Sequence, residues 1–226
     1  FMEGSIISKQ RTAASAALAS KVLAAAEPDV IGFVGCGPIN VSVAQFLASS
    51  WPGVRQFTAF DLDPDRSRAF GEELCEFIPG AVFTTAASLE ALLSDCSMVS
   101  FGTTAIKPYV DNLDASPAGA TILHVSLRDL SAGTVLSNHN IVDDLDHVNR
   151  AATSIHLAST QTGNTDFVHG SLGDLLLGNV DLPERDERKV IFSPFGLGVL
   201  DLAVADMVLR TIAGKAGGTV IESFLP

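Results

Sequence analysis

A glycine-rich turn followed by a distant acidic residue is the first feature of this sequence that could do chemistry. The turn comprises residues 35–40, Gly-Cys-Gly-Pro-Ile-Asn, and Asp61 lies 21 residues beyond Asn40. Gly35 permits a tight turn, and Gly37 lets the backbone approach a phosphate without a Cβ in the way. Free N–H groups and the positive dipole end of a helix attract phosphates, while a carboxylate can accept hydrogen bonds from a ribose. This combination predicts that the chain binds a dinucleotide.

The elements expected around the turn follow the order of a dinucleotide-binding βαβ unit. An apolar run at 30–34 predicts a strand, an apolar-patterned helix is expected at about 41–50, and a second strand is expected at 56–60. Pro38 suits the first helical turn, where its missing N–H costs little, and Ile39 lies in the same turn.

The motif departs from the usual pattern at its third glycine position, which holds Asn40. On its own the motif is therefore also compatible with an ordinary glycine turn in an α/β sheet. Asp61, with no basic residue directly after it, favours NAD over NADP. Arg66 and Arg68 moderate that preference, because either side chain could reach a 2′-phosphate. We expect NAD as the cofactor.

Strand and helix patterns alternate along the chain and predict an α/β fold, a Rossmann-type doubly wound parallel sheet. Further strands are expected at residues 81–84, 97–104, 121–126, 140–143 and 189–193. Helices are expected at residues 4–26, 63–77, 88–93 and 199–213, with mostly helical chain over 147–178 and a strand-like tail at 219–225.

Polar side chains come at the ends of several of these strands. Thr103 and Thr104 end one strand, Ser126 and Asp129 end or follow the next, and Asp143 ends a third. Ligands bind beyond the carboxyl ends of the strands in such sheets, and small hydroxyl residues suit the nicotinamide side of a dinucleotide. Threonine and serine at a strand end are equally typical of an ordinary transition from strand to loop without a binding role. With the glycine turn and Asp61, these residues predict a catalytic site along one edge of the sheet.

The first and last helices raise separate expectations. The helix at 4–26 is rich in alanine, which allows close packing, and Ser8 is its expected N-cap. Arg11 would then lie in the first turn, where an arginine is ordinarily a solvated surface charge. The helix at 199–212 is expected to be buried in the core. The chain begins at Phe1 inside a structured-looking element, so we expect further sequence upstream.

Composition limits the classes of partner. The chain has 226 residues, 47% of them hydrophobic, and a net charge of −12, which argues against nucleic acid or anionic membranes as partners. Three cysteines without a C-x-x-C pair favour a reducing compartment, so a cytoplasmic location is expected. No apolar run is long enough to span a membrane. The five histidines show no ligand spacing, so no metal site is expected.

Five stretches of the sequence carry a family resemblance. They are MEGSIISKQRTAASA (2–16), GFVGCGPIN (32–40), HVSLRDLS (124–131), VDDLDHVNRAATSIHLA (142–158) and FSPFGLGVLDLA (192–203). Together they resemble the ornithine cyclodeaminase/mu-crystallin family, and the third and fifth are most similar to its N-(2-amino-2-carboxyethyl)-L-glutamate dehydrogenases. The resemblance implies an enzyme that uses NAD and water to release L-2,3-diaminopropionate, a siderophore or peptide-antibiotic precursor, and 2-oxoglutarate.

The resemblance also implies roles for individual residues. Arg11 would hold a carboxylate of an amino-acid substrate, and Asp129 would move protons at the reacting carbon. The implied cofactor contacts are Gly35, Gly37, Pro38, Ile39 and Asp61, with Thr103, Thr104 and Ser126 nearer the nicotinamide and Asp143 at the next strand end.

The resemblance further implies a domain layout. Residues 1–28 would link to an N-terminal substrate and dimerisation domain that is largely absent from this sequence, and residues 29–194 would form the NAD-binding domain. Residues 195–226 would return toward the N-terminal domain, in a homodimer. Other family activities, namely ornithine cyclodeaminase, ketimine reductase or alanine dehydrogenase, stay open, as does a non-catalytic NAD-binding module.

Overall fold

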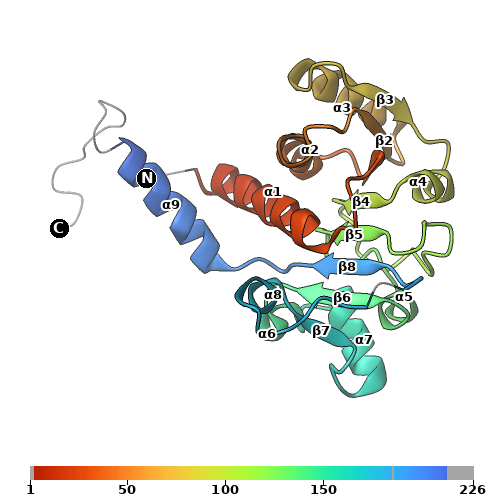
Figure 1. Ribbon diagram of the computed structural model, residues 1–226, viewed down its shortest axis with the longest axis vertical. Helices are drawn as coiled ribbons and strands as arrows, with labels where there is room; N and C mark the ends of the chain where they lie inside the picture. Colours follow the sequence, from red (N-terminus) through yellow and green to blue (C-terminus); the bar gives the residue numbers. More distant parts are fainter. Residues whose placement is uncertain (1–2, 185, 213–226) are drawn as a thin grey trace.

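A sheet of eight parallel strands forms the centre of the part of the chain that the computed structural model describes, residues 3–184 and 186–212 (Figure 1). The strands are β1 (Val30–Val34), β2 (Gln56–Phe60), β3 (Val82–Thr85), β4 (Met98–Phe101), β5 (Thr121–His124), β6 (His139–Val142), β7 (Val168–Ser171) and β8 (Val190–Ser193). Their spatial order is β3-β2-β1-β4-β5-β8-β6-β7. The predicted α/β fold with a doubly wound parallel sheet is confirmed.

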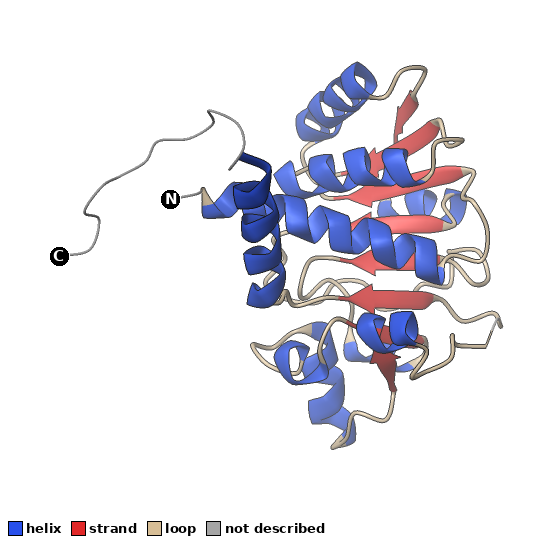
Figure 2. Cartoon of the chain, turned by 60° about the vertical axis from the view of Figure 1, so that its left-hand side comes forward, coloured by secondary structure: helices blue, strands red, loops and turns tan. Residues whose placement is uncertain are grey.

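Helices cover both faces of this sheet (Figure 2). They are α1 (Gly4–Leu23), α2 (Pro38–Ser50), α3 (Pro64–Phe77), α4 (Leu89–Asp95), α5 (Ala132–Leu136), α6 (Leu145–Val148), α7 (Ser154–Thr162), α8 (Leu172–Leu177) and α9 (Gly198–Ile212). One apolar core lies between the sheet and α1, α2, α3 and α8, and a second lies between the sheet and α4 to α7. Successive strand residues alternate between these cores, so Phe33 joins the first and Val34 the second.

Helix α1 packs closely on α2 through its alanines, as predicted. Ala13, Ala16, Ala17 and Ala19 are all buried, and the indole N–H of Trp51 donates to Ser20 Oγ at 2.9 Å. The predicted N-cap is wrong. The helix begins at Gly4, and its N-cap Glu3 accepts the N–H of Ser5 through its side chain. Ser8 and Arg11 therefore lie inside the helix, because capping falls to the first side chain that can reach a free N–H.

The segment at 147–178 contains a strand that the sequence pattern does not predict. Strand β7 lies between α7 and α8 in the chain and pairs with β6 at the edge of the sheet. It is four residues long, contains Gly170, and is partly exposed. Such a strand shows neither a continuous apolar run nor a regular alternation, which are the signals that identify strands.

Strand β8 lies in the middle of the sheet although it comes last among the described strands. Ile191 is in register with Ile122 of β5 on one side and with Asn140 of β6 on the other. Among the described residues, β6 and β7 join the rest of the sheet through β8. The carboxyl ends of β5, β8 and β6 consequently lie side by side.

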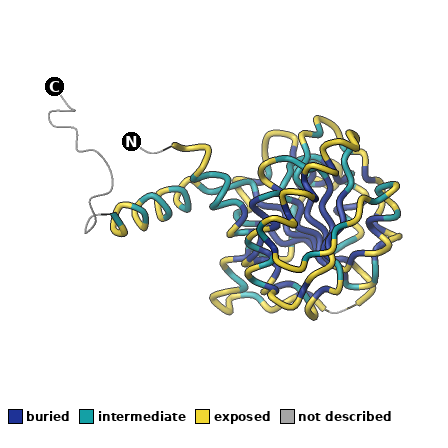
Figure 3. The backbone as a smooth tube through the Cα atoms, turned by 90° about the horizontal axis from the view of Figure 1, so that it is seen from above, coloured by how far each residue is buried: buried dark blue, intermediate teal, exposed yellow. Residues whose placement is uncertain are grey.

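Helix α9 projects from the body beside α1, and its exposure contradicts the prediction of a buried core helix (Figure 3). None of its described residues is buried, and Val199, Leu202, Met207 and Leu209 are each more than half exposed. Apolar composition predicts burial only when a second surface is present to cover the helix. Residue 213 and the predicted tail at 219–225 lie outside the described residues. Neither α9 nor any other described helix is long and apolar enough to cross a membrane.

Candidate active site

The glycine turn joins β1 to α2. Protein atoms pack closely against it at Gly35 and leave space beside it at Gly37. Gly35 has a φ of +84°, and its N–H donates to the carbonyl of Phe60 at 2.9 Å. A Cβ on Gly35 would lie 2.8 Å from the carbonyl oxygen of Gly102, whereas the nearest atom to a Cβ on Gly37 would be 4.0 Å away. Gly35 is thus required by packing and backbone conformation, and Gly37 leaves room for a phosphate. Burial raises the pKa of the Cys36 thiol to about 11, so this side chain is a neutral part of the turn.

The N-terminus of α2 has no side-chain cap. Pro38 takes the first helical position, as predicted, and the N-cap Gly37 offers no side-chain hydrogen bond. By contrast, the N-cap side chains of α1 and of α3 to α8 all accept a first-turn N–H. The side chain of Ile39 is 40% exposed in the same turn. Uncapped N–H groups and the helix dipole suit an anionic group such as a pyrophosphate.

Asn40 explains why the third position of the motif is not glycine. It is fully buried, and its Nδ2 donates to the carbonyls of Val34 at 3.0 Å, Gly35 at 2.7 Å and Ser100 at 3.4 Å. Its Oδ1 accepts the hydroxyl of Ser100 at 2.8 Å. A glycine at this position would permit close packing of the helix on the strand, whereas Asn40 joins β1, the turn and β4 by hydrogen bonds.

Asp61 approaches the glycine turn from the end of β2. Its Oδ2 accepts the N–H of Cys36 at 2.8 Å, and its Oδ1 accepts the N–H of Asp63 at 3.0 Å. Each carboxylate oxygen retains a lone pair for a ribose hydroxyl. Arg66 and Arg68 are exposed. Arg68 pairs with Asp65 of α3 at 2.8 Å, and Arg66 lies 4.0 Å from Asp63, the N-cap of α3. Exposed pairs of this kind hold an arginine only weakly.

Asp129 follows β5 and is completely buried. Its Oδ1 accepts the hydroxyl of Thr103 and the hydroxyl of Tyr109, the latter at 2.9 Å, and its Oδ2 lies 3.3 Å from His124 Nε2. The methyl group of Thr103 would lie 3.0 Å from a Cβ on Gly35. Thr103 therefore joins the glycine turn to Asp129, as the positions of these residues at strand ends predict.

The environment of Asp129 keeps its carboxylate ionised. Burial raises the pKa of Asp129, but the hydrogen bond and charge of His124, with smaller contributions from Ser126 and Thr103, outweigh burial and lower the pKa to about 2. Burial, followed by the charge of Asp129, raises the pKa of the Tyr109 phenol. At neutral pH the structure thus holds a carboxylate that can accept a proton and a phenol that keeps one.

His124 connects Asp129 to β8. Its Nδ1 lies 3.1 Å from Ser193 Oγ, and the His124 residue is 1% exposed. A protonated ring donates from Nε2 to Asp129, and so does the neutral tautomer that accepts at Nδ1 from Ser193. The other neutral tautomer accepts the backbone N–H of Asp129 at Nε2, at 3.3 Å. An ionised Asp129 favours donation from Nε2, because this directs a donor at the carboxylate.

A second polar cluster lies where β6 and β8 end. Both carboxylate oxygens of Asp143 accept backbone N–H groups of the turn into α9, from Phe195 at 3.0 Å and from Gly196 at 2.7 Å. Asp143 thus fixes this turn. The sequence predicts a cofactor contact for Asp143 and does not predict this structural role. The guanidinium of Arg11 lies against Gly196, where a Cβ would be 3.1 Å from Arg11 Nη2.

Arg11 is held from α1 itself and from α9. Its Nε donates to Asp201 Oδ1 at 3.2 Å and its Nη2 donates to Ser8 Oγ at 3.3 Å. The Arg11 side chain is 12% exposed, so it is not the solvated surface charge that an isolated arginine suggests. The cluster around Arg11 and Asp143 is linked through the chain to the cluster around Asp129. Gly196 lies against Arg11, and Ser193, three residues earlier, lies against His124.

Sequence reasoning missed three residues of the site. Tyr109, His124 and Ser193 surround or support Asp129. Tyr109 is the only tyrosine in the chain, which could have drawn attention to it. Ser193 ends the predicted strand at 189–193, and His124 lies within the predicted strand at 121–126. Of the remaining predicted residues, Thr104 is exposed beside Thr103, and Ser126 lies partly buried, with its N–H donating to the carbonyl of Phe101 at 2.9 Å.

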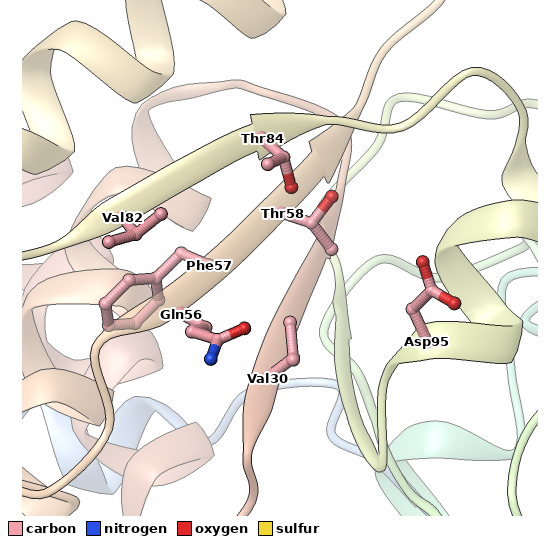
Figure 4. Close-up of a pocket in the computed structure, with 7 residues that line it drawn as sticks. All are labelled: Val30, Gln56, Phe57, Thr58, Val82, Thr84 and Asp95. Carbon is pink, nitrogen blue, oxygen red and sulfur yellow. The ribbon is translucent and has the colours of Figure 1, made fainter.

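A hollow in the described part of the chain shares no residue with these clusters; Figure 4 shows the side chains that line it. It has a volume of about 330 Å³ and is lined by Val30, Gln56, Phe57, Thr58, Val82, Thr84 and Asp95. Val30, Gln56 and Val82 are the first residues of β1, β2 and β3, so the hollow opens at the amino ends of the strands. Ligands of open α/β sheets bind at the opposite ends, and the hollow adds nothing to the site.

The sequence matches one protein family over most of its length. Residues 1–216 match the ornithine cyclodeaminase/mu-crystallin family. The chain belongs to this family. Its members are NAD(P)-dependent oxidoreductases that act on amino acids or imines, which confirms the resemblance at the level of the family.

A curated relative is the N-((2S)-2-amino-2-carboxyethyl)-L-glutamate dehydrogenase of Staphylococcus aureus. The two sequences are 24% identical over 225 residues, which are 99% of this chain and 67% of the relative. The chain therefore spans about two thirds of the length of this relative.

Two solved structures share the fold. The Δ1-pyrroline-2-carboxylate reductase of Thermococcus litoralis, in complex with NADH and L-proline, aligns with a TM-score of 0.90 at 22% identity and covers 97% of this chain and 69% of its own. An archaeal alanine dehydrogenase dimer with bound NAD aligns with a TM-score of 0.83 at 26% identity, covering 96% and 68%.

Proposed function

We propose that this chain carries the cofactor-binding and proton-transfer residues of an NAD-dependent N-(2-amino-2-carboxyethyl)-L-glutamate dehydrogenase. The observation that carries the proposal is a fully buried, ionised Asp129 joined through Thr103 to a glycine turn with an uncapped helix behind it. The Staphylococcus aureus relative supports this substrate, because it matches 99% of the chain. The products would be L-2,3-diaminopropionate and 2-oxoglutarate.

The residues around the turn fit a nicotinamide dinucleotide. The open side of Gly37 and the free first turn of α2 would hold the pyrophosphate, and Asp61 would bind the adenosine ribose. NAD is proposed over NADP because Asp61 is an acid at the position that would face the adenosine ribose. Thr103 would lie near the nicotinamide, since it lies between the turn and Asp129.

The protein's own residues would position the substrate and move its protons. When bound, NAD supplies the acceptor for a hydride from the α-carbon of the glutamate moiety. Asp129 would be the final acceptor of a proton released when water adds to the resulting C=N bond, and it starts the reaction in the ionised form that this requires. Collapse of the adduct would release the two products.

Arg11 is the proposed anchor for a substrate carboxylate. Two of its five N–H donors are used by Asp201 and Ser8, which leaves donors for a planar, bidentate contact with a carboxylate. The contact with Asp201 fixes the direction of the guanidinium, so less side-chain entropy would be lost when the substrate binds.

We also propose a homodimer in which the exposed apolar side chains of α9 are covered. Four large apolar side chains of α9 are more than half exposed, which is unusual for a surface without a partner. The archaeal alanine dehydrogenase is described as a dimer. Sedimentation at micromolar concentration checks this part of the proposal, and a monomer that persists at all concentrations contradicts it.

A second candidate function keeps the chemistry and changes the substrate. The alanine dehydrogenase of Archaeoglobus fulgidus is 25% identical over 99% of this chain, close to the identity of the Staphylococcus aureus enzyme. Arg11 and Asp129 would serve any α-amino acid, because each acts on groups that all such substrates share. A cytoplasmic location remains the expectation for either substrate.

Incubation with NAD and single substrates separates these functions. We expect NADH absorbance to rise with NAD and N-(2-amino-2-carboxyethyl)-L-glutamate and not with NAD and L-alanine or L-ornithine. In a separate mixture of NADH and a cyclic imine, we expect no fall in NADH absorbance. A rise with L-alanine alone would replace the proposed substrate. Calorimetric titration with NAD tests the cofactor separately, and binding without turnover of any substrate would favour a non-catalytic NAD-binding module.

Replacement of Asp129 tests its role directly. Asp129→Asn should keep NAD affinity within a factor of two or three and lower kcat by about 100-fold or more, which is the usual contribution of a positioned base. Normal turnover in this variant would refute proton transfer by Asp129.

A further inference from the structure

Asp129 cannot itself touch a substrate in this structure. Its exposed fraction is 0%, whereas Tyr109, whose hydroxyl donates to Asp129 Oδ1 at 2.9 Å, is 44% exposed. The other oxygen, Oδ2, faces His124, which is itself 1% exposed. Any group that approaches from the open edge of the sheet therefore meets the hydroxyls on Oδ1 before it meets the carboxylate.

Two hydroxyls donate to Asp129 Oδ1, and they differ in their remaining hydrogen-bonding capacity. Thr103 Oγ1 donates to Asp129 and also accepts the N–H of Ala105 at 3.1 Å, so it acts as a donor and an acceptor at once. The Tyr109 hydroxyl donates to Asp129 from a ring that is nearly half exposed. The phenol oxygen gives its one proton to Asp129 and retains a lone pair that can accept a hydrogen bond from water.

The backbone of Tyr109 is fixed to Asp129. The N–H groups of Tyr109 and Val110 both donate to the carbonyl of Asp129, at 3.0 and 2.9 Å, and Val110 forms an isolated parallel bridge with Leu130. The phenol and the carboxylate are therefore held in register by their own main chains. A relay between them needs no movement of the loop.

We propose that Tyr109 is the group that meets the reacting water, and that it passes the water's proton to Asp129. The inference rests on the proposed function. The water oxygen bonds to the carbon of the protonated C=N group, and the π-electron pair goes to nitrogen. One water proton moves to the Tyr109 oxygen while the Tyr109 proton moves to Asp129 Oδ1. The neutral adduct and a protonated Asp129 result, so charge and atoms balance.

The charges around the pair decide which group carries the proton before water arrives. Asp129 faces Tyr109, with Asp61 acting from farther away, and both carboxylates favour the neutral phenol. His124 faces Asp129 and favours the carboxylate. The proton therefore lies on Tyr109 and the accepting site is empty before water arrives. His124 is a positioning residue in this scheme, because it acts through Asp129.

A titration of the single tyrosine tests the pairing without any turnover. Because Tyr109 is the only tyrosine in the chain, phenolate absorbance in alkaline solution reports on it alone. In the wild type it should ionise well above the ordinary pKa of about 10, and Asp129→Asn should bring it down toward that value. A wild-type phenol that ionises at the ordinary pKa overturns the inference, whatever the substrate proves to be.

Single-turnover kinetics with NAD and N-(2-amino-2-carboxyethyl)-L-glutamate test the relay itself. Tyr109→Phe should form NADH at the wild-type rate and release 2-oxoglutarate about 100-fold more slowly, because only the addition of water needs the hydroxyl. Ile106→Ala changes an exposed residue of the same loop and should change neither rate. NAD affinity and the midpoint of urea unfolding should stay the same in both variants, which separates the relay from a structural role.

The outcomes are distinguishable. If the wild type forms no NADH, the proposed function fails, and the titration still decides whether Tyr109 is coupled to Asp129. If the wild type is active and Tyr109→Phe releases 2-oxoglutarate normally, the relay is wrong. If Thr103→Val, and not Tyr109→Phe, forms NADH normally but releases 2-oxoglutarate slowly, then Thr103 and not Tyr109 meets the water.

Discussion

Two regions at the same edge of the sheet hold buried or partly buried polar side chains beyond parallel strands. The partners that fix these side chains differ between the two regions. At the glycine-turn end, Asn40 and Asp129 are fully buried, and each is held by several partners from β4, β5 or the loops that follow them. At the β6–β8 end, Asp143 fixes a turn by two backbone hydrogen bonds, and α9 beyond it has no buried residue. The first end is set by its own packing, while the second depends on a few polar contacts. Substitutions at each end should reveal this difference.

The largest effect is expected at Gly35. Gly35→Val places a branched side chain at a φ of +84° and a Cβ 2.8 Å from the Gly102 carbonyl. The free energy of unfolding should fall by about 3 kcal/mol or more, and NAD affinity should fall at least 100-fold. Urea denaturation and calorimetry measure these quantities. Gly37→Ala is the matched control, because its Cβ would meet open space. It should leave stability nearly unchanged and weaken only NAD binding.

Asn40→Ala should give the next largest effect. The substitution removes the donor shared by the carbonyls of Val34 and Gly35 and the acceptor for the Ser100 hydroxyl. Buried polar groups left without partners cost about 1–3 kcal/mol each, partly relieved by water entering the space, so we expect a loss of about 3 kcal/mol in urea unfolding. Asn164→Ala, at an exposed loop position, is the control. A loss of under about 1 kcal/mol for Asn40→Ala would show that the turn does not depend on this side chain.

Asp129 should make the wild type more sensitive to acid than Asp129→Asn. Its pKa is about 2 when folded and about 3.9 when unfolded. The unfolded chain therefore takes up this proton first as the pH falls. The carboxylate contributes about 2 kcal/mol above pH ~4, and this contribution disappears as the pH falls toward ~2, with roughly half lost by pH ~3. Urea unfolding of both proteins at several pH values measures it. Parallel pH curves for the two proteins would contradict the low pKa.

The smallest effects are expected at the β6–β8 end. Asp143→Ala removes both acceptors of the turn at 195–196, so amide exchange in residues 194–212 should accelerate, with a global loss of about 1 kcal/mol. NAD affinity should not change if Asp143 holds the turn and not the cofactor. Asp201→Asn weakens a partly exposed ion pair with Arg11 and should cost less than about 1 kcal/mol. A large loss of NAD affinity in Asp143→Ala would support the predicted cofactor contact.

Much of the fold could be predicted because local sequence signals and the structure agree. The strands at 30–34 and 56–60 are found with their predicted bounds, since each is a short, mostly apolar segment bounded by turn residues. The helix at 63–77 was predicted from Asp63-Pro64, and Asp63 is its side-chain cap. Strand β7 was missed because a half-exposed edge strand with a central glycine has no distinctive period.

The site was predictable only in part, because partners depend on tertiary structure. Asp129 follows a predicted strand, so its place at the sheet edge could be inferred. Its contacts come from Thr103, Tyr109 and His124, which lie 26, 20 and 5 residues away in sequence, and no local pattern links them. The exposure of α9 was unpredictable for the opposite reason, since its composition alone resembles that of a core helix.

The position of β8 has a consequence for how the protein is made. Strands β5 and β6 both pair with β8, and β8 begins 66 residues after the end of β5. At about 5–20 residues per second, a ribosome takes roughly 3–13 s to add that stretch. Until then β5 and β6 present unpaired, apolar strand edges, which can pair with other chains. The nascent chain is therefore most vulnerable to aggregation just before residues 190–193 leave the ribosome, and this four-residue strand completes the sheet.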